Sequence, residues 1–151
     1  MPTTSCGFKD SNGVRGADYL VFHGPTLPVH IGFDPAHPPG SAAPPNLQSQ
    51  GLYALVDTGA TTNCIDNGLA LQLNLPIVNQ QEIAGVGGRM TVNVYLCQIY
   101  IPSLMFTDFG SFAGVNLIAG GQAHHALIGR TFLKNFTLNY DGRTGAVTIS
   151  S

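Results

Sequence analysis

The chain has 151 residues, a formal net charge of −2 and only 9% charged residues. Its length suits a single domain with a sizeable hydrophobic core, and its apolar content of 44% argues against a disordered chain. Because the 6 basic residues are scattered and no apolar run is long enough to span a bilayer, we expect neither a nucleic-acid partner nor a membrane segment.

The low charge content predicts a neutral surface, part of which would be covered by a second subunit or by a hydrophobic ligand or substrate. The three cysteines, Cys6, Cys64 and Cys97, are widely spaced, which fits reduced thiols better than a disulfide framework or a zinc site. The residues after Met1 have neither a basic start nor an apolar core, so we expect no secretory signal. We therefore predict a cytoplasmic protein without a metal or another cofactor.

The predicted elements begin after a polar, glycine-containing segment at 1–16, which we expect to be a flexible arm preceding a single domain at 17–151. Residues 17–24 and 27–33 are rich in β-branched and aromatic side chains, which predicts two strands. The proline-rich stretch 34–51 is expected to be a loop between strands, not a linker between domains.

Residues 52–57 form a nearly continuous apolar run, which predicts a strand that is buried on both faces. The leucine-rich stretch 65–76 predicts a short helix that is capped by Asp66 and ended by Pro76. Residues 81–102 comprise a strand, a glycine cluster and a longer strand, which together predict a β-hairpin.

Residues 103–126 show no clear pattern. The segment 129–136 is a candidate helical turn, and 136–150 predicts a hairpin with its turn at residues 141–145. The chain as a whole is therefore expected to be mostly β, with one or two short helices.

The stretch LVDTGAT at 55–61 contains the first candidate for chemistry. Asp57 ends a buried strand, where a carboxylate needs hydrogen bonds or a partner charge. Thr58 and Gly59 would supply backbone donors as the chain turns, and Gly59 permits a tight turn. Taken alone the triplet is a weak signal, because a strand end followed by a turn explains it more simply.

Two further motifs follow this triplet, AGVGGR at 84–89 and ALIGRTFL at 126–133. In this order, the three motifs resemble those of the retropepsin-like aspartic proteases, the family of the retroviral proteases and their retrotransposon and bacterial relatives. The resemblance covers residues from about 27 to 149. It implies that 17–151 is a retropepsin-like domain, with a closed β-barrel of the acid-protease type and a flap hairpin at 83–96.

The resemblance extends to individual residues of the first motif. Asp57 matches the catalytic aspartate, and Thr58 matches the threonine whose hydroxyl bonds across a dimer. Gly59 matches the glycine whose carbonyl faces the substrate. Ala60 stands where pepsin-like enzymes have serine, and because alanine cannot donate a hydrogen bond to the carboxylate, the resemblance implies a pH optimum less acidic than that of pepsin.

The other two motifs match the flap and a structural strand. The positions that match the flap tip, which closes over bound peptide, are Gly85, Val86, Gly87 and Gly88. The positions that match the strand behind the catalytic loop and the arginine after it are Leu127, Ile128, Gly129 and Arg130. In retroviral members this arginine pairs with an acidic residue soon after the triplet, whereas this chain has Thr61 and Thr62 there, so the partner of Arg130 is left open.

An aspartic-protease site needs two carboxylates, and the chain contains a single Asp-Thr-Gly. Two facing carboxylates share one proton, so that one acts as a base and the other as an acid. The site would therefore require a homodimer with one Asp57 from each subunit. The implied function is that of an aspartic endopeptidase acting on peptide or protein substrates.

Two other interpretations stay open. A retropepsin fold can serve as a non-catalytic peptide-binding or dimerisation module, and a generic β-barrel binding protein can carry the triplet by coincidence. His124 and His125 could bind a metal or take part in catalysis, but since no cysteine or acidic cluster accompanies them in the sequence, we expect surface or loop histidines. Cys64 is expected to be a buried free thiol, with a redox switch as the alternative.

Overall fold

The computed structural model describes residues 2–85 and 87–151, and strands make up most of its regular structure. The first strands along the chain are β1 (Thr3–Ser5), β2 (Thr26–Gly32), β3 (Ser49–Val56), β4 (Cys64–Asp66) and β5 (Ile77–Gly85). The later strands are β6 (Gly88–Ile101), β7 (Phe106–Val115), β8 (Ala126–Ile128), β9 (Thr137–Asp141) and β10 (Ala146–Ser150). The helices are α1 (Gly16–His23), α2 (Asn67–Gln72) and α3 (Arg130–Leu133), and a 3-10 turn, η1, spans Pro102–Leu104. The prediction of a mostly β chain is confirmed, but the described residues contain three short α-helices where one or two were expected.

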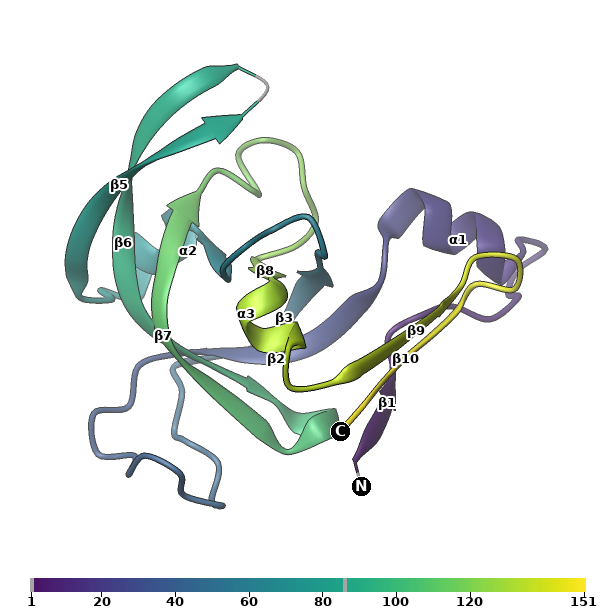
Figure 1. Cartoon of the computed structure of the whole chain (residues 1–151), viewed down its shortest axis with the longest axis horizontal. Helices are drawn as coiled ribbons and strands as arrows, with labels where there is room; N and C mark the ends of the chain where they lie inside the picture. The colour runs from purple at the N-terminus through teal and green to yellow at the C-terminus, as the bar shows by residue number, and fades with distance from the viewer. Residues whose placement is uncertain (1, 86) are drawn as a thin grey trace.

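The larger sheet has the strand order β2-β3-β8-β4-β7-β6-β5. Because β2 also pairs with β6, the strands from β2 to β6 close into a ring, and β5 extends from its edge (Figure 1). Apolar side chains from facing strands fill the interior, and those of Leu27, Ile31, Ile99 and Ile128 have no exposed surface. This packing gives the loops at the rim of the ring a rigid base.

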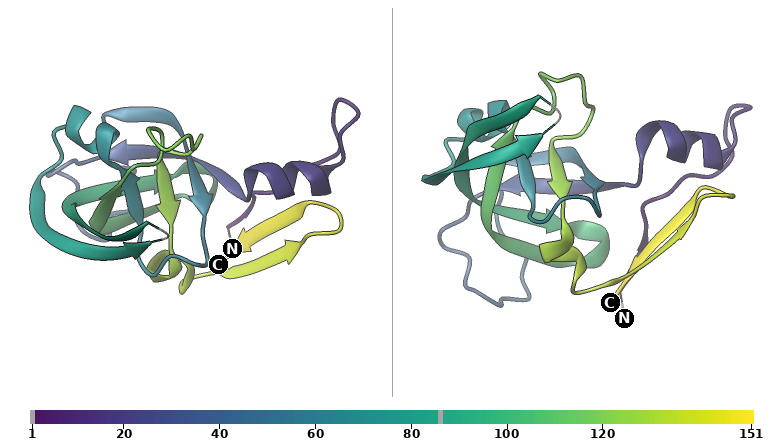
Figure 2. Two further views of the ribbon diagram at one scale, coloured as in Figure 1. Left: turned by 90° about the horizontal axis from the view of Figure 1, so that it is seen from above. Right: turned by 45° about the horizontal axis from the view of Figure 1, so that its top comes forward.

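A smaller sheet with the order β1-β10-β9 lies beside the ring, and α1 lies close to it (Figures 1 and 2). Its strands bring the two ends of the chain together, since Thr3 pairs with Ser150 and the amide of Ser151 donates to the carbonyl of Pro2. The segment 1–16, which we expected to be a flexible arm, therefore contributes a strand. Asp10 in this segment also accepts a hydrogen bond from the amide of Gly16 at 2.8 Å.

The prediction of a strand at 17–24 was wrong, because this segment forms α1. Its apolar residues are not spaced for either a buried strand or a buried helix face, and Val21 and Phe22 are each 84% exposed. The helix ends at Gly24, which has a φ of 70° and donates its amide to the carbonyl of Leu20. Composition suggested a strand, whereas the segment begins a helix at Arg15, whose carbonyl accepts the amides of Asp18 and Tyr19.

The prediction that residues 52–57 are buried on both faces was also wrong. Ala54 and Val56 are buried, whereas Tyr53 between these positions is 50% exposed. One face of β3 therefore packs into the ring, and the other is partly open.

The remaining elements lie near their predicted positions, but α2 ends at Gln72 instead of at Pro76, and β3 begins at Ser49, within the predicted loop 34–51. Asp66 caps α2 by accepting the amide of Leu69 at 3.1 Å, and α3 forms the helical turn expected within 129–136. The strands β2, β5–β6 and β9–β10 lie where the sequence placed them, and the unassigned stretch 103–126 holds β7 and the start of β8. Within residues 2–85 and 87–151, no helix is both long and apolar enough to cross a membrane.

Candidate active site

Asp57 directly follows β3, at the start of the loop that leads to β4. Its amide donates to the carbonyl of Ile128 at 2.9 Å, and its carbonyl accepts the amide of Ala60 at 3.2 Å. The Oδ1 atom accepts the amide of Gly59 at 2.9 Å. Asp57 itself is half-buried, whereas Thr58 and Gly59 are exposed. The backbone of Asp57 is therefore held by Ile128 and Ala60, and its carboxylate by Gly59, while the tip of the loop faces outward.

Strand β8 fixes both ends of this loop. It runs parallel to β3, with Val56 opposite Ile128, and antiparallel to β4, with Cys64 opposite Leu127. A central strand that pairs with the chain before and after a loop leaves the loop little freedom. The structure thus brings the predicted motif at 127–129 beside the predicted motif at 57–60.

Arg130 binds the Asp57 loop through its side chain and its backbone. Its Nη1 donates to the carbonyl of Thr58 at 2.7 Å, and its Nη2 donates to the hydroxyl of Thr61 at 3.0 Å. Its amide donates to the carbonyl of Ala60 at 2.9 Å. The guanidinium thus binds the two oxygens as a planar fork. The partner that the sequence left open is a backbone carbonyl and a threonine hydroxyl.

Gly129, which directly follows β8, packs so closely against the Asp57 loop that only a glycine fits there. A Cβ atom built at this residue would lie 2.5 Å from the carbonyl oxygen of Thr62 and 2.9 Å from that of Ala60. Real side chains do not approach backbone oxygens so closely, so any larger residue would push the loop away. The absence of a side chain at 129 lets the two segments contact each other directly.

Asn63 is a site residue that the sequence analysis missed. It is 4% exposed, and its Oδ1 accepts the amide of Gly129 at 2.9 Å while its Nδ2 donates to Asp108 Oδ2 at 2.6 Å. Asp108 lies on β7, and burial raises the pKa of its carboxyl, although the hydrogen bond from Asn63 lowers it. No motif marked Asn63, because its partner lies in the stretch 103–126, which showed no pattern.

Cys64 lies close to the same loop. Burial, and to a smaller extent the negative charge of Asp57, raise the pKa of its thiol to about 11. At neutral pH the sulfur is therefore a protonated thiol, which is a poor nucleophile and a poor metal ligand. This favours the interpretation of Cys64 as a packed free cysteine. Cys6 and Cys97 are also free and are buried.

The hairpin of β5 and β6 projects from the ring at the top of Figure 1. Gly85 pairs with Gly88, whose φ is 100°, and Gly87 and Gly88 are exposed. Seen from above, the end of the hairpin points back over the ring (Figure 2). The predicted site residue Val86 lies outside the described residues. The structure shows the expected hairpin at 83–96 as part of a longer one.

The two adjacent histidines occupy the loop before β8. His124 is buried, its Nε2 lies 3.0 Å from the hydroxyl of Thr26, and burial lowers its pKa. It is a loop residue, as expected, but it packs inward instead of lying on the surface. Among residues 2–85 and 87–151, no group of three or more His, Cys, Asp or Glu side chains is arranged to hold a metal ion.

Comparison with known proteins gives no assignment. The sequence matches no model of a known protein family, and it matches no curated protein.

Proposed function

We propose that this protein is an aspartic endopeptidase of the retropepsin type that acts as a homodimer. The main observation in favour of this proposal is that hydrogen bonds from other elements hold the Asp57 loop in place. Arg130 binds the loop through Thr58, and Asn63 holds the adjoining Gly129. A catalytic group has to be held in its productive geometry by the residues around it, and these contacts would do so for Asp57.

The second carboxylate would come from another copy of the chain. The other aspartates of the ring have structural partners: Asp66 accepts the amides of Leu69 and Leu117, and Asp108 accepts from Asn63. A two-fold axis next to the exposed Thr58 and Gly59 would place two Asp57 carboxylates face to face. The low charge content of the chain agrees with such an association.

In the proposed reaction the ionised carboxylate takes a proton from a water molecule, while the water oxygen attacks the carbonyl carbon of the peptide bond. The protonated carboxylate donates its proton to the carbonyl oxygen, and the tetrahedral intermediate then collapses with protonation of the leaving amine. The β5–β6 hairpin would close over an extended peptide and bind its backbone as an added strand. Ala60 places the pH optimum above that of pepsin, and a cleavage maximum near pH 2 to 3 would contradict this.

The decisive experiment combines the mass in solution with the cleavage of a peptide library by the wild type, Asp57→Asn and Asp18→Asn. Asp18 is an exposed aspartate on α1 whose contact with Arg15 is a surface ion pair, so its loss is expected to change little. We expect a dimer in all three cases, with cleavage lost only in Asp57→Asn, by at least about 1,000-fold.

Two results would contradict the proposal. A monomer that cleaves, with undiminished activity in Asp57→Asn, would rule out a shared dyad. A dimer that binds peptides, but cuts them neither as the wild type nor as Asp57→Asn, would instead identify a non-catalytic peptide-binding module.

A further inference from the structure

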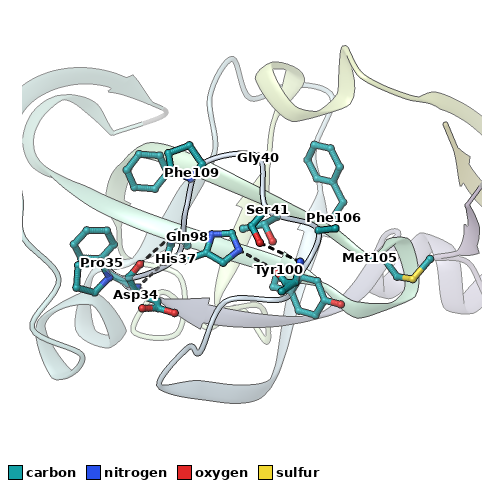
Figure 3. A pocket seen from close by; sticks show the side chains of 15 residues that line it. Asp34, Pro35, His37, Gly40, Ser41, Gln98, Tyr100, Met105, Phe106 and Phe109 are labelled. Carbon is teal, nitrogen blue, oxygen red and sulfur yellow. Dashed lines mark hydrogen bonds between the residues drawn. The ribbon is translucent and has the colours of Figure 1, made fainter.

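A pocket of about 510 Å³ lies between the proline-rich loop after β2 and the strands β6 and β7 (Figure 3). Its apolar lining includes Phe33, Tyr100, Met105, Phe106 and Phe109. Pockets that bind small organic molecules commonly have volumes of about 300 to 1,000 Å³ and mostly apolar walls with a few polar groups. In both respects this pocket fits that class.

The pocket is separate from the candidate active site. Thr107 and Phe109 line it, whereas Asp108 between them bonds to Asn63 beneath the Asp57 loop. Among the described residues that line the pocket, none belongs to the Asp57 loop at 57–63, and neither Gly129 nor Arg130 is one of them. The pocket is therefore a separate feature and needs an explanation of its own.

The wall formed by the loop is held in place by two bidentate contacts, one from the exposed Gln48 and one from the buried Gln98. Gln48 accepts the amide of Phe33 and donates to its carbonyl, both at 2.9 Å. Gln98, which is 4% exposed, accepts the amide of Asp34 at 2.6 Å and donates to its carbonyl at 3.3 Å. These pairs close the base of the loop. Its prolines reduce the number of conformations open to the unfolded chain, so ordering the loop costs less entropy. The pocket is therefore formed before a ligand binds.

The rim of the pocket exposes apolar surface that lacks a cover. Met105 is 74% exposed and has a left-handed backbone with φ of 49°, and Phe109 is 55% exposed. The left-handed backbone of Met105 follows from its position as the C-cap of η1, where its amide donates to the carbonyl of Pro102. Together with the pocket behind them, these two residues indicate a bound apolar group.

The polar groups of the pocket define the ligand further. Among the described residues that line it, none is a lysine or an arginine, and Asp34 is the acidic one, so an anion is disfavoured. The Nε2 atom of His37 lies 2.8 Å from the carbonyl of Ala43, and since a carbonyl only accepts, Nε2 carries the hydrogen. In the neutral ring, Nδ1 is then an acceptor. Figure 3 places His37 at the centre of the lining side chains.

We propose that this pocket binds a small, uncharged heteroaromatic molecule that bears an N–H group. Its ring packs against the aromatic side chains, and its N–H donates to Nδ1 of His37. This site is independent of the proposed peptidase activity.

The test is a titration of the full chain with indole, followed by amide NMR shifts, with benzofuran and benzoate as comparison ligands. Benzofuran has nearly the shape of indole but no N–H, so it should bind about fivefold more weakly. Benzoate, an anion, should not saturate the pocket. The indole shifts should saturate and should centre on residues 33–43 and 98–109.

Variants separate the hydrogen bond from the packing. His37→Phe keeps an aromatic ring but removes the acceptor, so indole and benzofuran should bind it equally. Phe109→Ala should weaken both ligands about fivefold or more. The matched control is Tyr140→Ala on β9, because Tyr140 is also 55% exposed and lies outside the pocket, and its removal should leave both affinities unchanged.

Three results would overturn the proposal. The first is the absence of saturable indole shifts at the pocket, and the second is an unchanged preference for indole in His37→Phe. The third is a set of pocket shifts that depends on protein concentration without any ligand, which would identify a second copy of the chain as the occupant.

Discussion

Two loops of this protein are held by side chains from distant strands, yet they are built differently. The Asp57 loop packs against β8 without free space, since the carbonyl oxygen of Thr62 lies where a side chain at Gly129 would begin. The loop after β2 is closed at its base by Gln48 and Gln98, but it encloses a pocket. The tight packing of the Asp57 loop can hold its carboxylate in one position. The loop after β2 is fixed only at its base and leaves a pocket that can admit a small molecule.

The largest effect is expected from Gly129→Ala, which tests the tight packing directly. The new methyl group would clash with two backbone carbonyls, so the free energy of unfolding should fall by about 3 kcal/mol. Urea unfolding measures this loss. The control is Gly110→Ala on β7, where a Cβ atom would have no neighbour within 4 Å and the change should be below about 0.5 kcal/mol. Equal effects of the two changes would show that the contact at 129 is not special.

Asn63→Ala should cost about 2 kcal/mol, because it leaves the Gly129 amide and the Asp108 carboxylate buried without their partner. On the proposed function it should also lower kcat more than it raises KM, since the loop would lose its position while the peptide contacts remain. Asn139→Ala on the exposed surface of β9 is the control. A stability loss with unchanged kcat would mean that Asn63 supports the fold alone.

Arg130→Lys should have a smaller effect on stability, of about 1 kcal/mol, because Arg130 is exposed. A lysine cannot bind the carbonyl of Thr58 and the hydroxyl of Thr61 as a fork. Peptide cleavage should fall about tenfold, measured beside Arg143→Lys in the turn between β9 and β10. If both variants cleave equally well, the fork does not position Asp57.

Asp108→Asn is expected to change stability in the opposite direction. Burial raises the pKa of Asp108 in the folded chain above its usual 3.8. Between the pKa of the unfolded chain and the higher pKa of the folded chain, the folded chain binds more protons. Its stability therefore falls as the pH rises through this range. Asparagine removes this dependence, and its carbonyl can still accept from Asn63. The variant should match the wild type near pH 3 and be more stable at pH 7, as measured by unfolding at each pH. A stability difference that is the same at every pH would show that the titration of Asp108 is not its cause.

The motifs and the local elements could be predicted because they depend on residues close together in the chain. The apolar run before Asp57, the Asp66 cap and the glycines of the β5–β6 hairpin each have a local cause, and a strand, a helix start and a hairpin formed at these places, although with different bounds. Residues 17–24 show a limit of such prediction, because composition favoured a strand while the segment forms the helix α1, with Val21 and Phe22 exposed. Asn63 shows another limit, since its role depends on Asp108, 45 residues further along the chain.

From the order of its residues alone, this chain is mostly β, has low charge and carries one Asp-Thr-Gly before a glycine-rich hairpin and a Leu-Ile-Gly-Arg stretch. Only the tertiary structure shows that Arg130 binds Thr58 and Thr61, that Asn63 links Gly129 to Asp108 on β7, and that the proline-rich loop encloses a pocket. The physical reason is that hydrogen bonds and cavities arise between segments that folding brings together. Periodicity and composition describe each segment by itself, so they cannot specify the partner of a side chain.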